Sequence, residues 1–215
     1  MPWSLNLFAD RLASNAALEL AAGPVRALYV EEGGITLASA GAAASLAPNS
    51  AWHGAAAASL AAGAPGARLL RFELCDGTAP ADRPLLAAAL ALDRDSAYLM
   101  RCDRVEFPPG GVAYHHTHQG PGVRCLVAGS IRIDSAGASH AYAPGQAWFE
   151  SGPDTVFAAA SPDAVTAFIR VMILPAACRG RSSIRYVRAE DQDKSKPQRY
   201  QIYIDQPIAL PGSPR

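Results

Sequence analysis

The sequence lacks the features that mark nucleic-acid-binding and membrane proteins. Its 215 residues include 19 basic and 19 acidic side chains, and no basic stripe with interleaved aromatic residues is present. Nucleic acid is therefore a poor candidate partner. No run of about 20 residues is apolar enough to cross a bilayer. The nearest, residues 55–67, is interrupted by Gly63, Pro65 and Gly66. We expect no membrane partner.

Several covalent and catalytic motifs are also missing. The four cysteines are widely spaced and form no Cys-x-x-Cys pair, which favours buried free thiols in a reducing compartment over disulfides or a zinc knot. The first residues lack the charged start and apolar run of a signal peptide, so we expect a cytoplasmic protein. No Gly-x-Ser-x-Gly elbow and no phosphate-binding loop before a helix are present.

What the sequence does contain is a series of short apolar or alternating runs punctuated by Gly, Pro, Asn and Asp. This pattern predicts an all-β fold, and the length allows two domains of about 100 residues each. The expected strands are residues 16–22, 25–31, 35–40, 42–46, 68–74, 98–107, 112–118, 123–128, 131–134, 139–143, 147–150, 155–159, 166–174 and 200–204. A turn is expected at Gly33-Gly34.

One segment predicts a helix. Residues 85–92 are rich in alanine and leucine, and Asp82 and Pro84 suit the start of a helix. We interpret this segment as a short connecting helix, with one domain over residues 1–92 and a second over 93–178. Residues 179–215 form a C-terminal extension whose last strand is expected to join a neighbouring sheet.

The two halves of the chain resemble each other. Residues 28–33 align with 124–129, residues 46–52 with 142–148, and residues 68–72 with 167–171. Although the identities are few, a diverged internal duplication explains this alignment better than chance.

The residues best suited to chemistry are three histidines within four positions, His115, His116 and His118. On a strand, side chains at i and i+2 project to the same face, so His116 and His118 share a face with Tyr114. Two imidazoles on one face can chelate a transition metal. The alternative is a polar strand at a barrel mouth with no metal.

The surroundings of this pair resemble the cupin superfamily. Gly110 stands five residues before His116, Gly129 closes the motif, and Pro144-Gly145-Gln146 matches the turn of the second cupin motif. The resemblance covers residues 100–174 well and the first half in outline. It implies two tandem cupin-type antiparallel β-barrels, jelly-roll-like, with metal ligands pointing into the second barrel.

Two of the four usual cupin ligands are absent. The glutamate position falls on Gly122 or Val123, and the second-motif histidine position falls near Val156. Glu150 is our candidate substitute, because two histidines and one carboxylate suit iron, manganese, zinc or nickel. A solvated rim carboxylate is the alternative. Asp154 is a weaker candidate because it lies in a turn.

Arg124 is expected to face inward on the strand that follows. A guanidinium there disfavours a bound cation and favours an anionic ligand held bidentately; alternatively, Arg124 pairs with Glu150. Two functions remain open. The first is a metal-dependent dioxygenase, isomerase or lyase acting on a small organic acid or carbonyl compound, with Arg124 orienting the substrate and Tyr114 donating a proton. The second is a non-catalytic cupin that binds a small, anionic ligand. No organic cofactor is expected, and exposed strand edges favour a homodimer.

Overall fold

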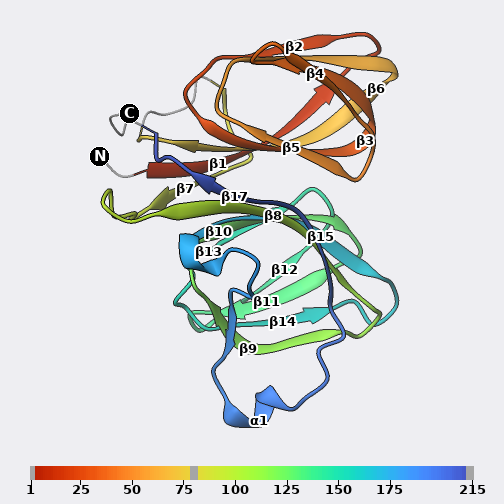
Figure 1. Cartoon of the computed structure of the whole chain (residues 1–215). Coiled ribbons are helices and arrows are strands. Elements are labelled where there is room, and N and C mark those ends of the chain that lie inside the picture. Colours follow the sequence, from red (N-terminus) through yellow and green to blue (C-terminus); the bar gives the residue numbers. More distant parts are fainter. Residues whose placement is uncertain (1–2, 78–81, 212–215) are drawn as a thin grey trace. The chain divides into compact units, whose positions relative to one another are not determined.

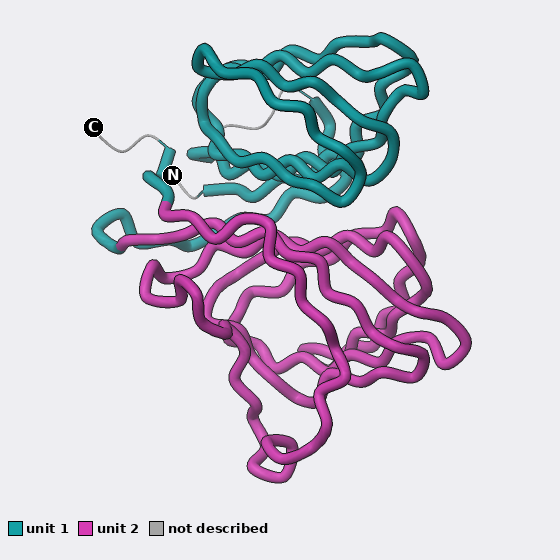
Figure 2. The backbone as a smooth tube through the Cα atoms, turned by 45° about the vertical axis from the view of Figure 1, so that its right-hand side comes forward, with its two compact units in different colours: residues 1–96, 208–215 teal, residues 97–207 magenta. Residues whose placement is uncertain are grey.

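The computed structural model describes residues 3–77 and 82–211. Strands make up 62% of the chain and form three antiparallel sheets, so the all-β prediction is confirmed. The chain divides into two compact units, Met1–Ser96 with Ile208–Arg215, and Ala97–Pro207 (Figure 2). Among the residues that the structure describes, no helix has the length and apolar character needed to span a membrane.

The first unit contains one seven-stranded sheet. Its central path runs β4-β3-β6-β1-β7, while β2 pairs with β6 and β5 pairs with β3. Buried apolar side chains such as Leu28, Leu60 and Leu69 form its core. The strands are β1 (Trp3–Leu12), β2 (Ala17–Leu20), β3 (Val25–Ser39), β4 (Ala42–Leu46), β5 (Ser50–Gly54), β6 (Ala58–Cys75) and β7 (Leu86–Leu90).

The predicted connecting helix is wrong, since Leu86–Leu90 forms β7. This strand pairs antiparallel with β1, itself a strand that the sequence pattern did not reveal. Within β7, Ala88 and Leu90 are buried while Ala87 and Ala89 are exposed, which is the two-residue period of a strand. Pairing with β1 therefore outweighs the weak helical preference of alanine.

The turn expected at Gly33-Gly34 is absent, because β3 runs through it as one strand whose pairing with β6 shifts register there. Gly33 has a φ of +72°, and a Cβ on it would lie 2.0 Å from the Gly66 carbonyl oxygen. Gly129, at the aligned position of the second unit, has a φ of +71°. In both units, glycine is needed where the strand bends against its neighbour.

The second unit is a pair of five-stranded sheets, ordered β13-β10-β15-β8-β17 and β12-β11-β14-β9-β16 (Figure 1). Apolar side chains from both sheets, among them Phe107, Leu126, Ile133 and Trp148, form one core cluster. The strands are β8 (Tyr98–Phe107), β9 (Val112–His118), β10 (Gly122–Ala128), β11 (Ile131–Ser135), β12 (Ala138–Tyr142), β13 (Ala147–Glu150), β14 (Val156–Ala160) and β15 (Thr166–Pro175).

The residues predicted to form a C-terminal extension belong to the second unit as far as Pro207. They comprise the short helix η1 (Ala176–Cys178), β16 (Ile184–Tyr186), helix α1 (Ala189–Gln192) and β17 (Arg199–Ile208). The segment adds two strands where one was expected, since β16 joins one sheet and β17 the other. Arg101 of β8 holds its beginning, donating hydrogen bonds to the carbonyl oxygens of Cys178 and Arg181.

The pairing registers of the two units agree with the alignment of the two halves. Trp148 lies opposite Arg124 in the second unit, and Trp52 lies opposite Leu28 in the first. The aligned residues therefore occupy equivalent places in their sheets.

Candidate functional site

The histidine strand β9 lies between β14 and β16. Its pairing with β14 shifts register along the strand. His116 is opposite Val156, whereas Ala113 is opposite Ala158. Three residues of β9 thus match two residues of β14, which is a β-bulge. The bulge leaves Ala113, His116 and His118 facing the space between the two sheets, where all three line a cavity.

The predicted position of Tyr114 beside the two histidines is wrong, and the bulge is the reason. Tyr114 does not line the cavity, and its ring lies 4.7 Å from Lys194 Nζ. Its backbone carbonyl contributes instead, accepting a hydrogen bond from His116 Nδ1 at 2.6 Å. Because a carbonyl oxygen only accepts, Nδ1 carries the proton and Nε2 keeps its lone pair.

Glu150 ends β13, directly opposite Gly122 of β10. A Cβ on Gly122 would lie 2.6 Å from the Val171 carbonyl oxygen and 2.7 Å from Met172 Cγ, so a glutamate does not fit at that position. The carboxylate comes from the paired strand instead. One ligand atom from each of His116, His118 and Glu150 lies within 4.8 Å of the other two, and all three residues are buried.

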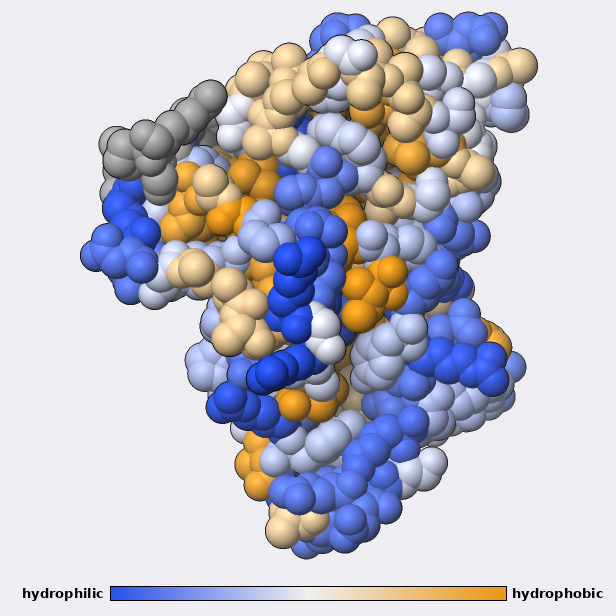
Figure 3. All heavy atoms as spheres, viewed as in Figure 1, coloured by the Kyte–Doolittle hydropathy of each residue, from blue (hydrophilic) through white to orange (hydrophobic). Residues whose placement is uncertain are grey.

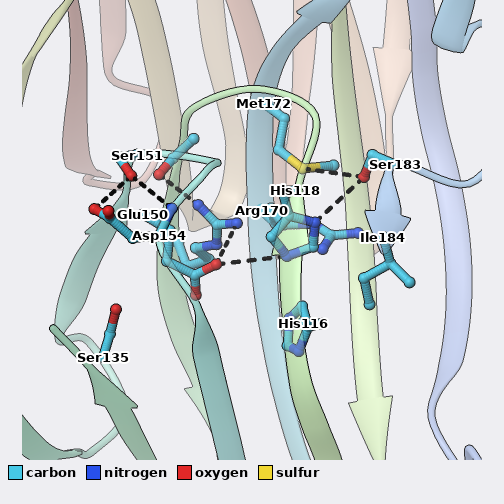
Figure 4. Close-up of polar contacts among 12 residues, drawn as sticks. His116, His118, Ser135, Glu150, Ser151, Asp154, Arg170, Met172, Ser183 and Ile184 are labelled. Carbon is cyan, nitrogen blue, oxygen red and sulfur yellow. Dashed lines mark hydrogen bonds and ion pairs between the residues drawn. The ribbon is translucent and has the colours of Figure 1, made fainter. Parts of the chain in front are cut away.

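The two oxygens of Glu150 have different surroundings. Oε1 accepts a hydrogen bond from Trp148 Nε1 at 2.9 Å. Oε2 lies 2.7 Å from the Arg124 guanidinium. It also lies 3.5 Å from His118 Nε2 (Figure 4). Neither contact has the alignment of a hydrogen bond, so Oε2 is buried without a hydrogen-bond partner. Arg124 and Oε2 therefore form an ion pair without a hydrogen bond. Lone pairs of Oε2 remain available to another partner.

The charges around the cavity balance. Arg170 holds Asp103 through two hydrogen bonds of 2.9 and 2.7 Å, and Arg124 faces Glu150. Burial lowers the pKa of Arg124 to about 10, against the opposing effect of Glu150, so Arg124 is protonated at neutral pH. Arg124 Nη1 also donates a hydrogen bond to the Gly122 carbonyl oxygen at 2.5 Å.

Both histidines are in the form that binds metals. Burial lowers the pKa of His116. Burial and then the positive charges of Arg170 and Arg124 hold the pKa of His118 well below its ordinary value of 6.5. Each imidazole is therefore neutral at pH 7, with one nitrogen free to act as a ligand.

The cavity between the sheets measures about 20 Å³, and its lining includes both histidines, Glu150, Arg124 and Arg170. A water molecule needs roughly 10–15 Å³ by this measure. The cavity therefore has room for one ion or water molecule, and an organic acid does not fit unless a neighbouring residue moves.

Asp154, the weaker of the two predicted carboxylate ligands, lies away from this cavity. It is exposed and accepts a hydrogen bond of 2.6 Å from Ser151 Oγ. It therefore serves its turn, as aspartate commonly does.

Several residues of the site were not predicted as such from the sequence. Arg170 lies within the apolar strand β15. A charged residue in an apolar run is unusual, and this feature of the sequence could have identified it as a site residue. Ser183, Ile184 and Tyr200 come from the C-terminal segment, where no sequence pattern indicates contact with β9. Trp148 packs in the core, lines the cavity and orients Glu150.

No protein-family model matches the sequence, and no curated protein matches it at a significant level. Solved structures do match. AerE from Microcystis aeruginosa aligns with a TM-score of 0.59 and 12% identity, over 80% of this chain and 87% of that chain. A variant of the oxalate decarboxylase OxdC from Bacillus subtilis aligns with a TM-score of 0.65 and 11% identity, over 86% of this chain and 71% of that chain. At these identities the likeness concerns the fold alone.

Proposed function

Starting from a chain that has the cupin fold, we propose that its second unit binds one divalent transition-metal ion through His116, His118 and Glu150. The observation that carries the proposal is the convergence of three buried ligand atoms within 4.8 Å of one another. Two imidazoles and one carboxylate suit iron, manganese, zinc or nickel.

The donor set fits such an ion in two further respects. Glu150 Oε2 is buried and makes an ion pair with Arg124 but no hydrogen bond, so it has lone pairs free to face an ion. His116 donates through Nδ1 to a backbone carbonyl, the arrangement that commonly orients a metal-binding imidazole. Arg124 is the one opposing group, because its guanidinium lies 2.7 Å from the same carboxylate oxygen and repels a second cation.

The charge balance supports a small organic acid as the ligand of the site. With neutral histidines, Arg124 and Arg170 are matched by Glu150 and Asp103. A divalent ion adds two positive charges to this buried group, and each carboxylate of a bound acid offsets one of them. Oxalate decarboxylase, which shares the fold, is described with Mn(II) centres.

We therefore propose an enzyme of the lyase, isomerase or dioxygenase type, acting on a small acid. When bound, the metal would polarise a carboxylate or carbonyl oxygen as a Lewis acid. Arg124 offers a second positive charge at the cavity wall, where a carboxylate can be held bidentately. Trp148 keeps Glu150 in place through its indole N–H.

Elemental analysis of protein purified without a histidine tag tests the metal proposal. We expect about one equivalent of a transition metal per chain, and a variant with His116→Ala and His118→Ala should contain none. Wild-type protein that stays free of metal after incubation with Mn²⁺, Fe²⁺, Zn²⁺ or Ni²⁺ would contradict the proposal.

A second candidate is a non-catalytic protein that binds a small anion without metal. The specific observation in its favour is that Arg124 already offsets the charge of Glu150 at 2.7 Å. In that case small acids should raise the melting temperature of metal-free protein, and Arg124→Gln should abolish the rise. Under the metal proposal, the same acids should act only on metal-loaded protein.

A further inference from the structure

The C-terminal segment over residues 179–207, which we name the cover segment, lies against the histidine strand. β16 pairs with β9 so that Ile184 is opposite His118 and Tyr186 is opposite His116. At the other end of the cover segment, β17 lies next to β8, at the edge of the sheet that does not contain β9. The cover segment thus extends from one sheet edge to the other, beside the strand that carries both imidazoles.

Ser183, the residue before β16, contacts a proposed ligand directly. It is 4% exposed, and its Oγ lies 3.4 Å from His118 Nδ1 and 3.7 Å from Met172 Sδ (Figure 4). Met172 Sδ can take the hydroxyl proton, because a thioether sulfur accepts hydrogen bonds. The Ser183 oxygen is then free to accept from His118 when Nδ1 carries the proton.

This contact matches the tautomer of His118 that a metal ligand at Nε2 requires. With the proton on Nδ1, Nε2 keeps its lone pair and faces Glu150 Oε2 at 3.5 Å. Without the Ser183 oxygen, the proton has its best remaining acceptor on the other side, at Glu150, and a proton on Nε2 prevents ligation. The hydroxyl group therefore favours the tautomer that a metal requires.

The cover segment also closes the cavity. Ile184 of β16 and Tyr200 of β17 both line it, on opposite sheets. The outer surface around α1 is mainly hydrophilic (Figure 3), which suits a segment that faces solvent. Because the cavity measures about 20 Å³, a small acid reaches the ion only when a lining side chain moves.

We propose that Ser183 is a positioning residue for His118, and that docking of the cover segment and binding of the metal ion stabilise each other. The inference rests on the metal site proposed above. By linkage, a segment that improves ion affinity when docked is itself held more firmly once the ion is bound.

Two substitutions separate this role from general effects on β16. Ser183→Ala removes the oxygen that faces His118. Ser182→Ala removes the hydroxyl of an exposed neighbour, which accepts a hydrogen bond from the Ile184 backbone N–H. Zn²⁺ affinity is measured by competition with a chelating dye. We expect Ser183→Ala to weaken it by about 10- to 100-fold and Ser182→Ala to leave it unchanged.

Two readouts report on the mechanism itself. Nitrogen-15 NMR of the metal-free protein should place the His118 proton on Nδ1, and Ser183→Ala should move it toward Nε2. Trypsin should cleave the cover segment, which contains Arg185, Arg188 and Lys194, more slowly when Zn²⁺ is bound. Ser183→Ala should reduce that protection.

The outcomes distinguish this inference from the proposed function. Zn²⁺ bound through His116 and His118, with equal affinity in wild type and Ser183→Ala, overturns the role of Ser183 and leaves the metal site intact. A cleavage rate that Zn²⁺ does not change overturns the linkage. Wild-type protein that binds no Zn²⁺ overturns the metal site and this inference together.

Discussion

At the scale of single residues, Glu150 connects the parts of the site. Its carboxylate contacts Trp148 Nε1 and the Arg124 guanidinium and lies 3.5 Å from His118 Nε2. The residue is 9% exposed, so these contacts are made at low dielectric, where each is stronger than in water. Substitutions at this residue should therefore affect both metal binding and stability.

Glu150→Gln tests both effects. We expect metal affinity to fall by at least about 100-fold, because a neutral amide is a poor ligand. We also expect unfolding free energy to fall by roughly 3–5 kcal/mol, since Arg124 is left buried without its counter-charge. Asp154→Asn is the matched control, an exposed carboxylate four residues away, and should change neither. Calorimetric titration and urea unfolding give the two values, and unchanged affinity in Glu150→Gln would remove this residue from the site.

The metal-free protein should lose stability in mild acid. Burial lowers the pKa of His116, and it lowers that of His118 well below 6.5. In the unfolded chain both groups titrate near 6.5, so below that pH the unfolded state binds more protons than the folded state. Unfolding free energy therefore rises with pH through this window, by at most about 2.7 kcal/mol per unit for two groups.

Urea unfolding at pH 7.5 and pH 5.5 measures this loss. The wild type should be less stable at the lower pH, and His118→Gln should show a smaller difference between the two. Equal differences in both proteins would show that the histidines do not cause the loss.

The residues at the site differ in how far the sequence could predict them. The two-residue spacing on a strand was enough to predict that His116 and His118 lie together. Glu150 was predicted as a ligand because the glutamate of the cupin motif is absent. Tyr114 was misplaced because the bulge in β9 depends on pairing with β14, and nothing local encodes it. Ser183 is distant in sequence and reaches His118 only through strand pairing.

At the scale of elements, two glycines with similar backbone angles should respond differently to alanine. Gly129 and Gly137 have φ values of +71° and +77°. A Cβ on Gly129 would lie 2.5 Å from Thr166 Oγ1, whereas nothing lies within 4 Å of one on Gly137. Gly137→Ala should therefore lower the free energy of unfolding by about 1–2 kcal/mol, the cost of a left-handed backbone at alanine. Gly129→Ala should lower it by clearly more.

Urea unfolding of the two variants compares these costs directly. Equal losses would mean that the close approach of β15 to Gly129 does not constrain the strand. A larger loss for Gly129→Ala supports the view that the bend ending β10 is held by its neighbour.

Strand pairing also explains which elements the sequence could predict. Strands with strong alternation or long apolar runs, such as β8 and β15, were predicted within one residue at each end. Residues 85–92 were mistaken for a helix because alanine favours helices locally, while pairing with β1 determines the outcome. The single strand β3 was divided in two because glycines that permit a bulge also permit a turn.

At the scale of the whole molecule, the two units differ in what their interiors contain. Where the second unit has Glu150 opposite Gly122, the first has Gly54 opposite Arg26. Arg26 contacts Glu73 at 2.6 Å, so its charge is already offset within the unit. We therefore expect one metal ion per chain, held by the second unit.

Calorimetric titration with Zn²⁺ checks this stoichiometry. His53 belongs to the first unit, and His53→Ala should bind one equivalent with wild-type affinity. Two equivalents in the wild type, with one lost in His53→Ala, would assign a second site to the first unit.

The most direct test of the account is a crystal grown with Zn²⁺, with anomalous scattering used to locate the ion. We predict one anomalous peak per chain, about 2.1 Å from His116, His118 and Glu150, with the Glu150 carboxylate turned from Arg124 toward the ion. A map with no peak between these residues, and with the Arg124–Glu150 pair undisturbed, would contradict the central claim that this is a metal site.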